Sequence, residues 1–364
     1  MRLFEPIEIN GMQLKNRIVM PAMHMNFGVT NRRARGYYVE RAKGGAGTII
    51  MPALTPDALI SDEVWQGRGN VASFLARLQQ LAGEVRRYGA RIGLQLWMGD
   101  MFPAGLWGGY GMGADIITGD RVAPSTAAAK RGLTKMEIET IIENFAGAAV
   151  RAREGGLDFV EIHGAHGYLV EQFFSPLFNK RSDEYGGSLK NRMRFGLDCV
   201  RRTREMVGRD YPVLFRVGAV EKPAGGVTLA DSVEYAVELE KAGADLIDVS
   251  TGDPSPHFSP PEGPEGCFVP WAAAIKARVK VPVMGVGRIL TAAAAEECLQ
   301  KGYLDLVGVG RQLIADAHWA EKIAEGRERD VVSCLYCNSC LDAVMVKHTE
   351  ASCPVNPDLG QEGG

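Results

Sequence analysis

The sequence predicts an α/β fold, a (β/α)8 TIM barrel with an N-terminal β-hairpin cap, from two observations. Short apolar runs alternate with segments of helical periodicity, and there are eight such runs. Each run is nearly continuous in apolar residues, as a strand buried on both faces requires. Eight β/α units in order favour a barrel, with a doubly wound sheet as the alternative. The runs lie at residues 17–23, 47–53, 91–97, 157–163, 212–217, 246–251, 282–287 and 306–311.

Turn and capping residues mark the elements around these strands. Asn10-Gly11 in the stretch 7–14 predicts a hairpin with a type I′ turn, suited to closing the N-terminal end of a barrel. Apolar residues recur at helical spacing between residues 70 and 87. Three threonines stand where further helices are expected to begin, at positions 134, 228 and 291.

Length and composition restrict the class of protein. The chain has 364 residues, 46% of them hydrophobic and 23% charged, which is typical of a globular protein. The net charge of -3 gives no basic footprint for nucleic acid. No apolar run reaches the roughly 18 residues of a membrane span, and the stretch Met1-Arg-Leu-Phe-Glu-Pro6 does not show the charged region followed by an apolar region that is typical of a signal peptide. We therefore expect a cytoplasmic protein without nucleic-acid or membrane partners.

Candidate catalytic residues follow the fourth strand. His163, His166 and Tyr168 stand within six residues of one another, separated by small residues. Barrel enzymes carry their chemistry at the carboxyl ends of the strands, so these side chains are expected to face a common site. The alternative is that they are ordinary polar residues at a strand-to-loop turn.

Two similar turns end strands seven and eight, Gly285-Val-Gly-Arg288 and Gly308-Val-Gly-Arg311. Loops at these places in barrels often bind a phosphate through backbone N–H groups. Gln95 and Arg216 interrupt apolar strands, and a buried arginine needs an anionic partner. A flavin with its phosphate would supply partners for both, whereas a structural salt bridge is the alternative for Arg216.

The C-terminal segment is rich in cysteine. Its pattern is C-x2-C-x2-C-x12-C, formed by Cys334, Cys337, Cys340 and Cys353. Three close thiols followed by a distant fourth favour a [4Fe–4S] cluster, with zinc or free thiols as alternatives. We expect an FMN-binding barrel at residues 1–330 and a cluster-binding segment at 331–364. Two long loops, 99–133 and 253–270, are also expected to be functional.

Several motifs together resemble the Old Yellow Enzyme family of FMN-dependent oxidoreductases over essentially the whole chain. They are Lys15-Asn-Arg-Ile-Val-Met-Pro21, His163-Gly-Ala-His-Gly-Tyr-Leu169, the stretch 179–192 and the two Gly-x-Gly-Arg turns. The cysteine segment is similar to the branch that contains 2,4-dienoyl-CoA reductase and trimethylamine dehydrogenase. The resemblance implies FMN contacts at Pro21, Ala22, Met23, Ala53, Gln95, Arg216, Gly287, Arg288, Gly310 and Arg311.

The resemblance also implies an activity. His163 and His166 would anchor the carbonyl of an α,β-unsaturated compound, Tyr168 would be the acid, and the four cysteines would bind [4Fe–4S]. Met23 stands where trimethylamine dehydrogenase attaches its flavin covalently, so we expect non-covalent FMN. We expect a homo-oligomeric ene-reductase that receives electrons from a separate donor protein. The alternatives are an amine dehydrogenase or oxidative N-demethylase, and an electron-transfer subunit of a larger complex.

Overall fold

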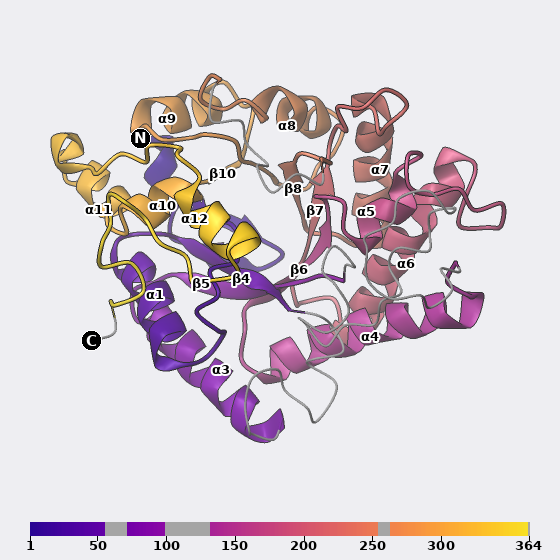
Figure 1. Cartoon of the computed structure of the whole chain (residues 1–364), viewed down its shortest axis with the longest axis horizontal. Coiled ribbons are helices and arrows are strands. Elements are labelled where there is room, and N and C mark those ends of the chain that lie inside the picture. The colour runs from indigo at the N-terminus through magenta and orange to yellow at the C-terminus, as the bar shows by residue number, and fades with distance from the viewer. Residues whose placement is uncertain (55–70, 99–131, 254–262, 363–364) are drawn as a thin grey trace.

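The chain folds into a closed barrel of parallel strands (Figure 1). The computed structural model describes residues 1–54, 71–98, 132–253 and 263–362. The strand order is β10-β3-β4-β5-β6-β7-β8-β9, so the predicted (β/α)8 barrel is confirmed and the doubly wound alternative is wrong. The barrel strands are β3 (Ile18–Met20), β4 (Thr48–Leu54), β5 (Arg91–Leu96), β6 (Phe159–Gly164), β7 (Val213–Gly218), β8 (Leu246–Ser250), β9 (Val283–Gly285) and β10 (Leu306–Gly308).

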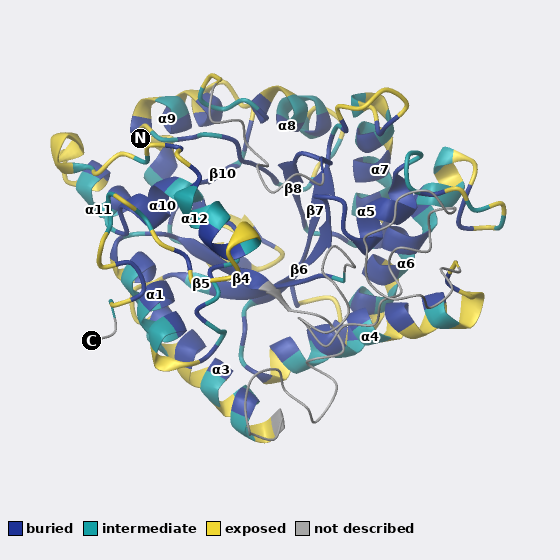
Figure 2. Cartoon of the chain, viewed as in Figure 1, coloured by how far each residue is buried: buried dark blue, intermediate teal, exposed yellow. Residues whose placement is uncertain are grey.

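Helices surround the barrel and turn their apolar faces to it, so that the strands are buried and the outer faces are exposed (Figure 2). The helices of the barrel are α1 (Arg32–Lys43), α3 (Val71–Arg86), α4 (Lys135–Glu154), α5 (Leu169–Phe174), α6 (Leu189–Val207), α7 (Leu229–Ala242), α8 (Val269–Lys276), α9 (Ala292–Gln300), α10 (Arg311–Ala315) and α11 (Trp319–Ala324). Short turns η1 (Arg2–Phe4) and η3 (Glu328–Asp330) flank them.

The predicted hairpin closes one end of the barrel. Strands β1 (Ile7–Ile9) and β2 (Met12–Leu14) pair antiparallel, and their turn has φ 45° at Asn10 and 76° at Gly11. A type I′ turn needs these two positive angles, which explains the Asn-Gly pair. Apolar side chains of the hairpin pack against inward residues of the barrel strands. The opposite end, where the strands terminate, is therefore the end left for a site.

Side-chain caps begin the predicted helices. The Thr134 hydroxyl accepts the Glu137 N–H and the Glu137 carboxylate accepts the Thr134 N–H, a capping box at the start of α4. Thr228 and Asp231 form the same pair at α7, and Thr291 caps α9. Local sequence thus sets where these helices begin.

The segment after residue 330 packs on the carboxyl end of the barrel and carries α12 (Ser339–Leu341) and the π-helical turn η4 (Asp342–Val346) (Figure 1, yellow). Its Glu362 forms a 2.7 Å ion pair with the fully buried Arg41 of α1. The division at residue 330 stays a prediction. The segment nevertheless lines the same cavity as the barrel, as described below.

Most of the two long loops predicted to be functional lies outside the described residues, and that prediction stays open. None of the helices in the described ranges combines the length and the apolar character needed to cross a bilayer.

Candidate active site

A large cavity opens at the carboxyl ends of the strands. Its empty space, counted with the open mouth, is about 1400 Å³. Ala53 belongs to β4, but its side chain lies outside the described residues. The other predicted cofactor and catalytic residues all line the cavity, namely Pro21, Ala22, Met23, Gln95, His163, His166, Tyr168, Arg216, Gly287, Arg288, Gly310 and Arg311.

The three predicted catalytic side chains form one cluster. The ring centroid of His163 lies 4.9 Å from that of His166 and 4.9 Å from that of Tyr168. His163 lies on β6, His166 adopts a left-handed backbone with φ 63°, and Tyr168 precedes α5. Trp97 packs edge-on against Tyr168, with 4.5 Å between the two ring centroids. The tight turn between strand and helix therefore brings all three polar groups to one wall.

Burial sets the protonation of this cluster. Loss of solvent, reinforced by the nearby Arg216 cation, holds the pKa of both His163 and His166 well below the usual histidine value. Burial also raises the pKa of Tyr168 to about 12, against a smaller lowering by Arg216. At neutral pH the imidazoles are thus neutral and the phenol keeps its proton. The Ala165 N–H donates to Nδ1 of His163 at 3.3 Å, so the hydrogen of that ring is on Nε2.

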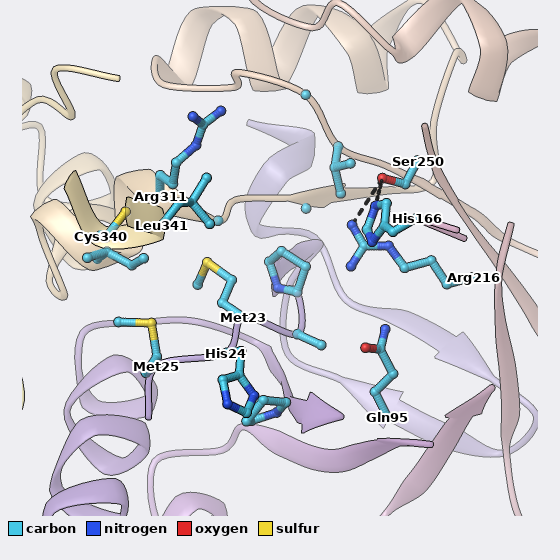
Figure 3. Close-up of a pocket in the computed structure, with 18 of the residues that line it drawn as sticks. Met23, His24, Met25, Gln95, His166, Arg216, Ser250, Arg311, Cys340 and Leu341 are labelled. Carbon is cyan, nitrogen blue, oxygen red and sulfur yellow. Dashed lines mark hydrogen bonds between the residues drawn. The ribbon is translucent and has the colours of Figure 1, made fainter. Parts of the chain in front are cut away.

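Ser250, at the end of β8, connects two of the predicted residues (Figure 3). Its hydroxyl lies 2.8 Å from Nε2 of His166 and accepts a hydrogen bond from Nη2 of Arg216 at 3.3 Å. The serine thus fixes the orientation of the imidazole and of the guanidinium together.

Two buried carboxyl groups lie among the strands below this wall. Nε of Arg216 lies 3.1 Å from Oδ2 of Asp248, and Nε2 of Gln95 donates to Oε1 of Glu161 at 2.7 Å. Both carboxyl side chains are fully buried. The protein itself therefore supplies the anionic partner that the sequence led us to expect from a cofactor. Arg216 still lines the cavity and can serve a ligand as well.

Desolvation shifts the pKa of both carboxyl groups upward. The pKa of Glu161 rises to about 8, first by burial and then by the neighbouring Asp248 charge. Burial raises the pKa of Asp248 to about 6, although Arg216 opposes the shift. Two acids share one guanidinium, so one of them keeps a proton at neutral pH.

This end of the cavity fits the pyrimidine edge of a flavin, which carries both hydrogen-bond donors and acceptors. The Gln95 amino group is committed to Glu161, so its carbonyl oxygen is left to accept from a ring N–H. The guanidinium of Arg216 supplies donors and positive charge beside it.

The opposite end fits a phosphate. Gly287 has φ 117°, and a Cβ there would lie 3.0 Å from the Phe268 nitrogen, so the turn requires glycine. A Cβ on Gly310 would lie 3.3 Å from Sδ of Met23. The absence of side chains at both turns leaves backbone and arginines accessible to an anion.

The four C-terminal cysteines line a second, smaller cavity, and Cys340 lines the large one as well (Figure 3). Four sulfur donors suit an iron–sulfur cluster or zinc. Within the described ranges, no three histidine, cysteine or acidic side chains lie close enough together to hold a metal ion.

Three candidate functional residues were not predicted from the sequence, namely Glu161, Asp248 and Ser250. A signal was present, because each stands two residues from another inward polar position in an otherwise apolar strand. The alternation of a β-strand therefore placed Glu161 with His163, and Asp248 with Ser250, on the inner face.

Comparison with known proteins agrees with this architecture. A 39% identical NADH oxidase of Thermoanaerobacter brockii aligns over 99% of this chain and 56% of its own length. The structure of a 2-naphthoyl-CoA reductase complex has a TM-score of 0.86, 30% identity, and coverage of 100% of this chain and 58% of that one. Histamine dehydrogenase from Rhizobium sp. 4-9 has a TM-score of 0.86, 26% identity, and coverage of 99% and 53%.

The chain spans about half the length of these relatives. The model of the NADH:flavin oxidoreductase / NADH oxidase family matches residues 2–330. The chain therefore belongs to this family, the Old Yellow Enzyme family of flavin-dependent oxidoreductases.

Proposed function

We propose that the protein reduces the C=C bond of an α,β-unsaturated carbonyl compound, using non-covalent FMN and a [4Fe–4S] relay. The observation that carries the proposal is the convergence of His163, His166 and Tyr168 in the cavity that also contains Gln95 and Arg216. The match to the NADH:flavin oxidoreductase family supports the flavin, and similarity to a 2-naphthoyl-CoA reductase supports reduction as the reaction.

The histidines polarise the substrate. Nε2–H of His163 donates to the carbonyl oxygen, and neutral His166, held by Ser250, completes the binding of that oxygen. Donors fixed in this way stabilise the negative charge that develops on the oxygen. Bound FMN supplies a hydride to the β-carbon.

Tyr168 completes the reaction. Its phenol, protonated because burial raises its pKa to about 12, gives its proton to the α-carbon as a general acid. Packing against Trp97 and His163 holds the ring in place for this transfer.

The phosphate turns and the cysteines complete the cofactor sites. Gly287, Arg288, Gly310 and Arg311 hold the FMN phosphate, and the cysteines hold the cluster. Cys340 belongs to the walls of both cavities, so a cluster held by the four cysteines would adjoin the flavin site. Such a cluster would supply one-electron transfer between a separate donor protein and the bound FMN.

Oxidation of an amine is the second candidate, favoured by the similarity to histamine dehydrogenase and by the cysteine spacing. An aromatic box is a common means of holding a methylated cation. In the resemblance to trimethylamine dehydrogenase, the positions that match the aromatic box of that enzyme are Pro52, His257 and Val344. Pro52 and Val344, which supply no aromatic ring, line the cavity here. His257, the third such position, lies outside the described residues. An electron-transfer subunit that turns over no small molecule is the third candidate.

Anaerobic titration of the purified protein distinguishes these candidates. Enones are added to the reduced protein and amines to the oxidised protein, and the flavin and cluster absorbance is followed. Reoxidation by an enone, without bleaching by an amine, is the expected result. Bleaching by an amine alone would establish the second candidate, and no response to either class would favour the third.

A further inference from the structure

The ring of Tyr336 lies against both arginines of the phosphate turns. The guanidinium carbon of Arg288 lies 3.9 Å from the ring centroid and that of Arg311 lies 4.3 Å from it. The tyrosine is 5% exposed and lines the flavin cavity together with both arginines. Each of the two cations over the ring is attracted by its π electrons, which offsets the repulsion between them.

The backbone of Tyr336 adopts a conformation that favours glycine, with φ 51°. Tyr336 stands between Cys334 and Cys337 in the sequence. A bulky residue at such an angle is strained unless its side chain makes compensating contacts. The two stacked guanidinium groups are those contacts.

The loop that carries Cys334, Cys337 and Cys340, here called the cysteine loop, is hydrogen-bonded to α10 next to this ring. The buried Gln312 donates to the Val332 carbonyl at 2.9 Å and accepts the Cys334 N–H at 2.9 Å. Nη1 of Arg311 donates to the side chain of Asn338. One short helix therefore carries both a phosphate arginine and the anchors of the cysteine loop.

We infer that Tyr336 is a positioning residue for the flavin phosphate, through which the cysteine loop becomes part of the FMN site. The ring holds Arg288 and Arg311 close together at the cavity wall, where one phosphate dianion reaches both. Without the ring, mutual repulsion separates the two cations before FMN arrives. The inference rests on the proposed FMN site, and it predicts an effect on the phosphate end of the flavin alone.

The test compares FMN with riboflavin, which lacks the phosphate. Flavin-free protein is titrated with each, and quenching of flavin fluorescence gives the two dissociation constants. Tyr336→Gly is the informative variant, because glycine accepts the left-handed backbone without strain. We expect it to weaken FMN binding about tenfold, equivalent to roughly 1.4 kcal/mol, and to leave riboflavin binding within about twofold.

Matched variants keep the test decisive. Tyr336→Phe preserves the ring and should bind FMN like the wild type, whereas Tyr336→Leu fills the space without π electrons and should behave like the glycine variant. Tyr303→Ala is the control, because it removes an exposed ring that precedes β10, at the opposite end of the barrel. Thermal melting verifies that each variant is folded. If the glycine variant does not fold, the flavin affinities of the leucine variant test the inference instead.

Equal losses of FMN and riboflavin affinity in the glycine and leucine variants, or no loss in either, would overturn the inference. Failure of the wild type to prefer FMN over riboflavin would instead reject the proposed phosphate site itself.

Discussion

The two ends of the flavin cavity are built in different ways. At the pyrimidine end, Gln95, Glu161, Arg216 and Asp248 extend from neighbouring strands, and the pairs that interact are in register, Gln95 with Glu161 and Arg216 with Asp248. At the phosphate end, Arg288, Arg311 and Tyr336 come from two turns and from the C-terminal segment. Backbone hydrogen bonds of the barrel fix the first set, whereas side-chain contacts fix the second. Substitutions at the two ends should therefore have separable effects.

The largest expected effect is at the C-terminal segment. Cys340→Ser should remove the cluster iron and sulfide almost completely, because a serine hydroxyl is a much poorer ligand for iron than a thiolate. FMN should remain bound at saturating concentration, since the strand-built end is unchanged. Iron, sulfide and flavin analysis checks this, with Cys298→Ser on α9 as the control. Full retention of iron and sulfide would argue against Cys340 as a ligand of the proposed cluster.

The next effect concerns the strand-built end. Tyr168→Phe should slow enone turnover by roughly 10²–10⁴-fold, the usual contribution of a general acid. Flavin reduction, measured by stopped-flow absorbance, should be spared because the phenol acts only on the substrate. Unchanged turnover would remove Tyr168 from the mechanism.

Two carboxylates of the C-terminal segment pair with arginines of α1, one buried and one exposed. Glu362→Gln leaves the fully buried Arg41 without its ion pair, and urea unfolding should show a loss of about 3–5 kcal/mol. Glu350→Gln is the matched control, because Glu350 is exposed, its partner Arg33 is only partly buried, and such surface pairs contribute about 0–1 kcal/mol. Equal effects would mean that burial of the pair is unimportant.

The smallest expected effect concerns how the free energy of unfolding depends on pH. The folded protein keeps Glu161 protonated up to its pKa of about 8, whereas the unfolded chain loses that proton near a pKa of about 4.3. The unfolded state thus binds fewer protons between these values, and stability falls as pH rises, by roughly 1.4 kcal/mol per pH unit.

Glu161→Gln removes this proton and keeps an acceptor for Gln95. Urea unfolding between pH 5 and pH 8 should therefore show that the free energy of unfolding depends less on pH in the variant than in the wild type. The pH dependence that Asp248 contributes should remain. Parallel curves for the variant and the wild type would assign the pH dependence to other groups.

The strand-built end was the more predictable from sequence. Local rules placed the hairpin turn at Asn10-Gly11, the capped helices and the apolar strands, and the order of β/α units then fixed which strand ends meet. The pairing of Arg216 with Asp248 was missed, because register between distant strands is a tertiary property. The same holds for Tyr336, which in sequence is merely an aromatic residue between two cysteines. Its role depends on turns that lie 25 and 48 residues earlier in the chain.

The hydrogen bonds of Gln312 to the backbone at Val332 and Cys334 affect how the proposed cluster would be assembled. A disordered thiol-rich segment must lose backbone freedom when it captures a metal centre. Here the amide of Gln312 already holds the chain on both sides of Ser333, and Tyr336 donates its N–H to the Cys334 sulfur. Much of that ordering therefore occurs when the polypeptide folds. For the proposed cluster, delivered iron and sulfide would meet a segment whose backbone is already held at Val332 and Cys334, and gathering the four thiols would be the remaining step.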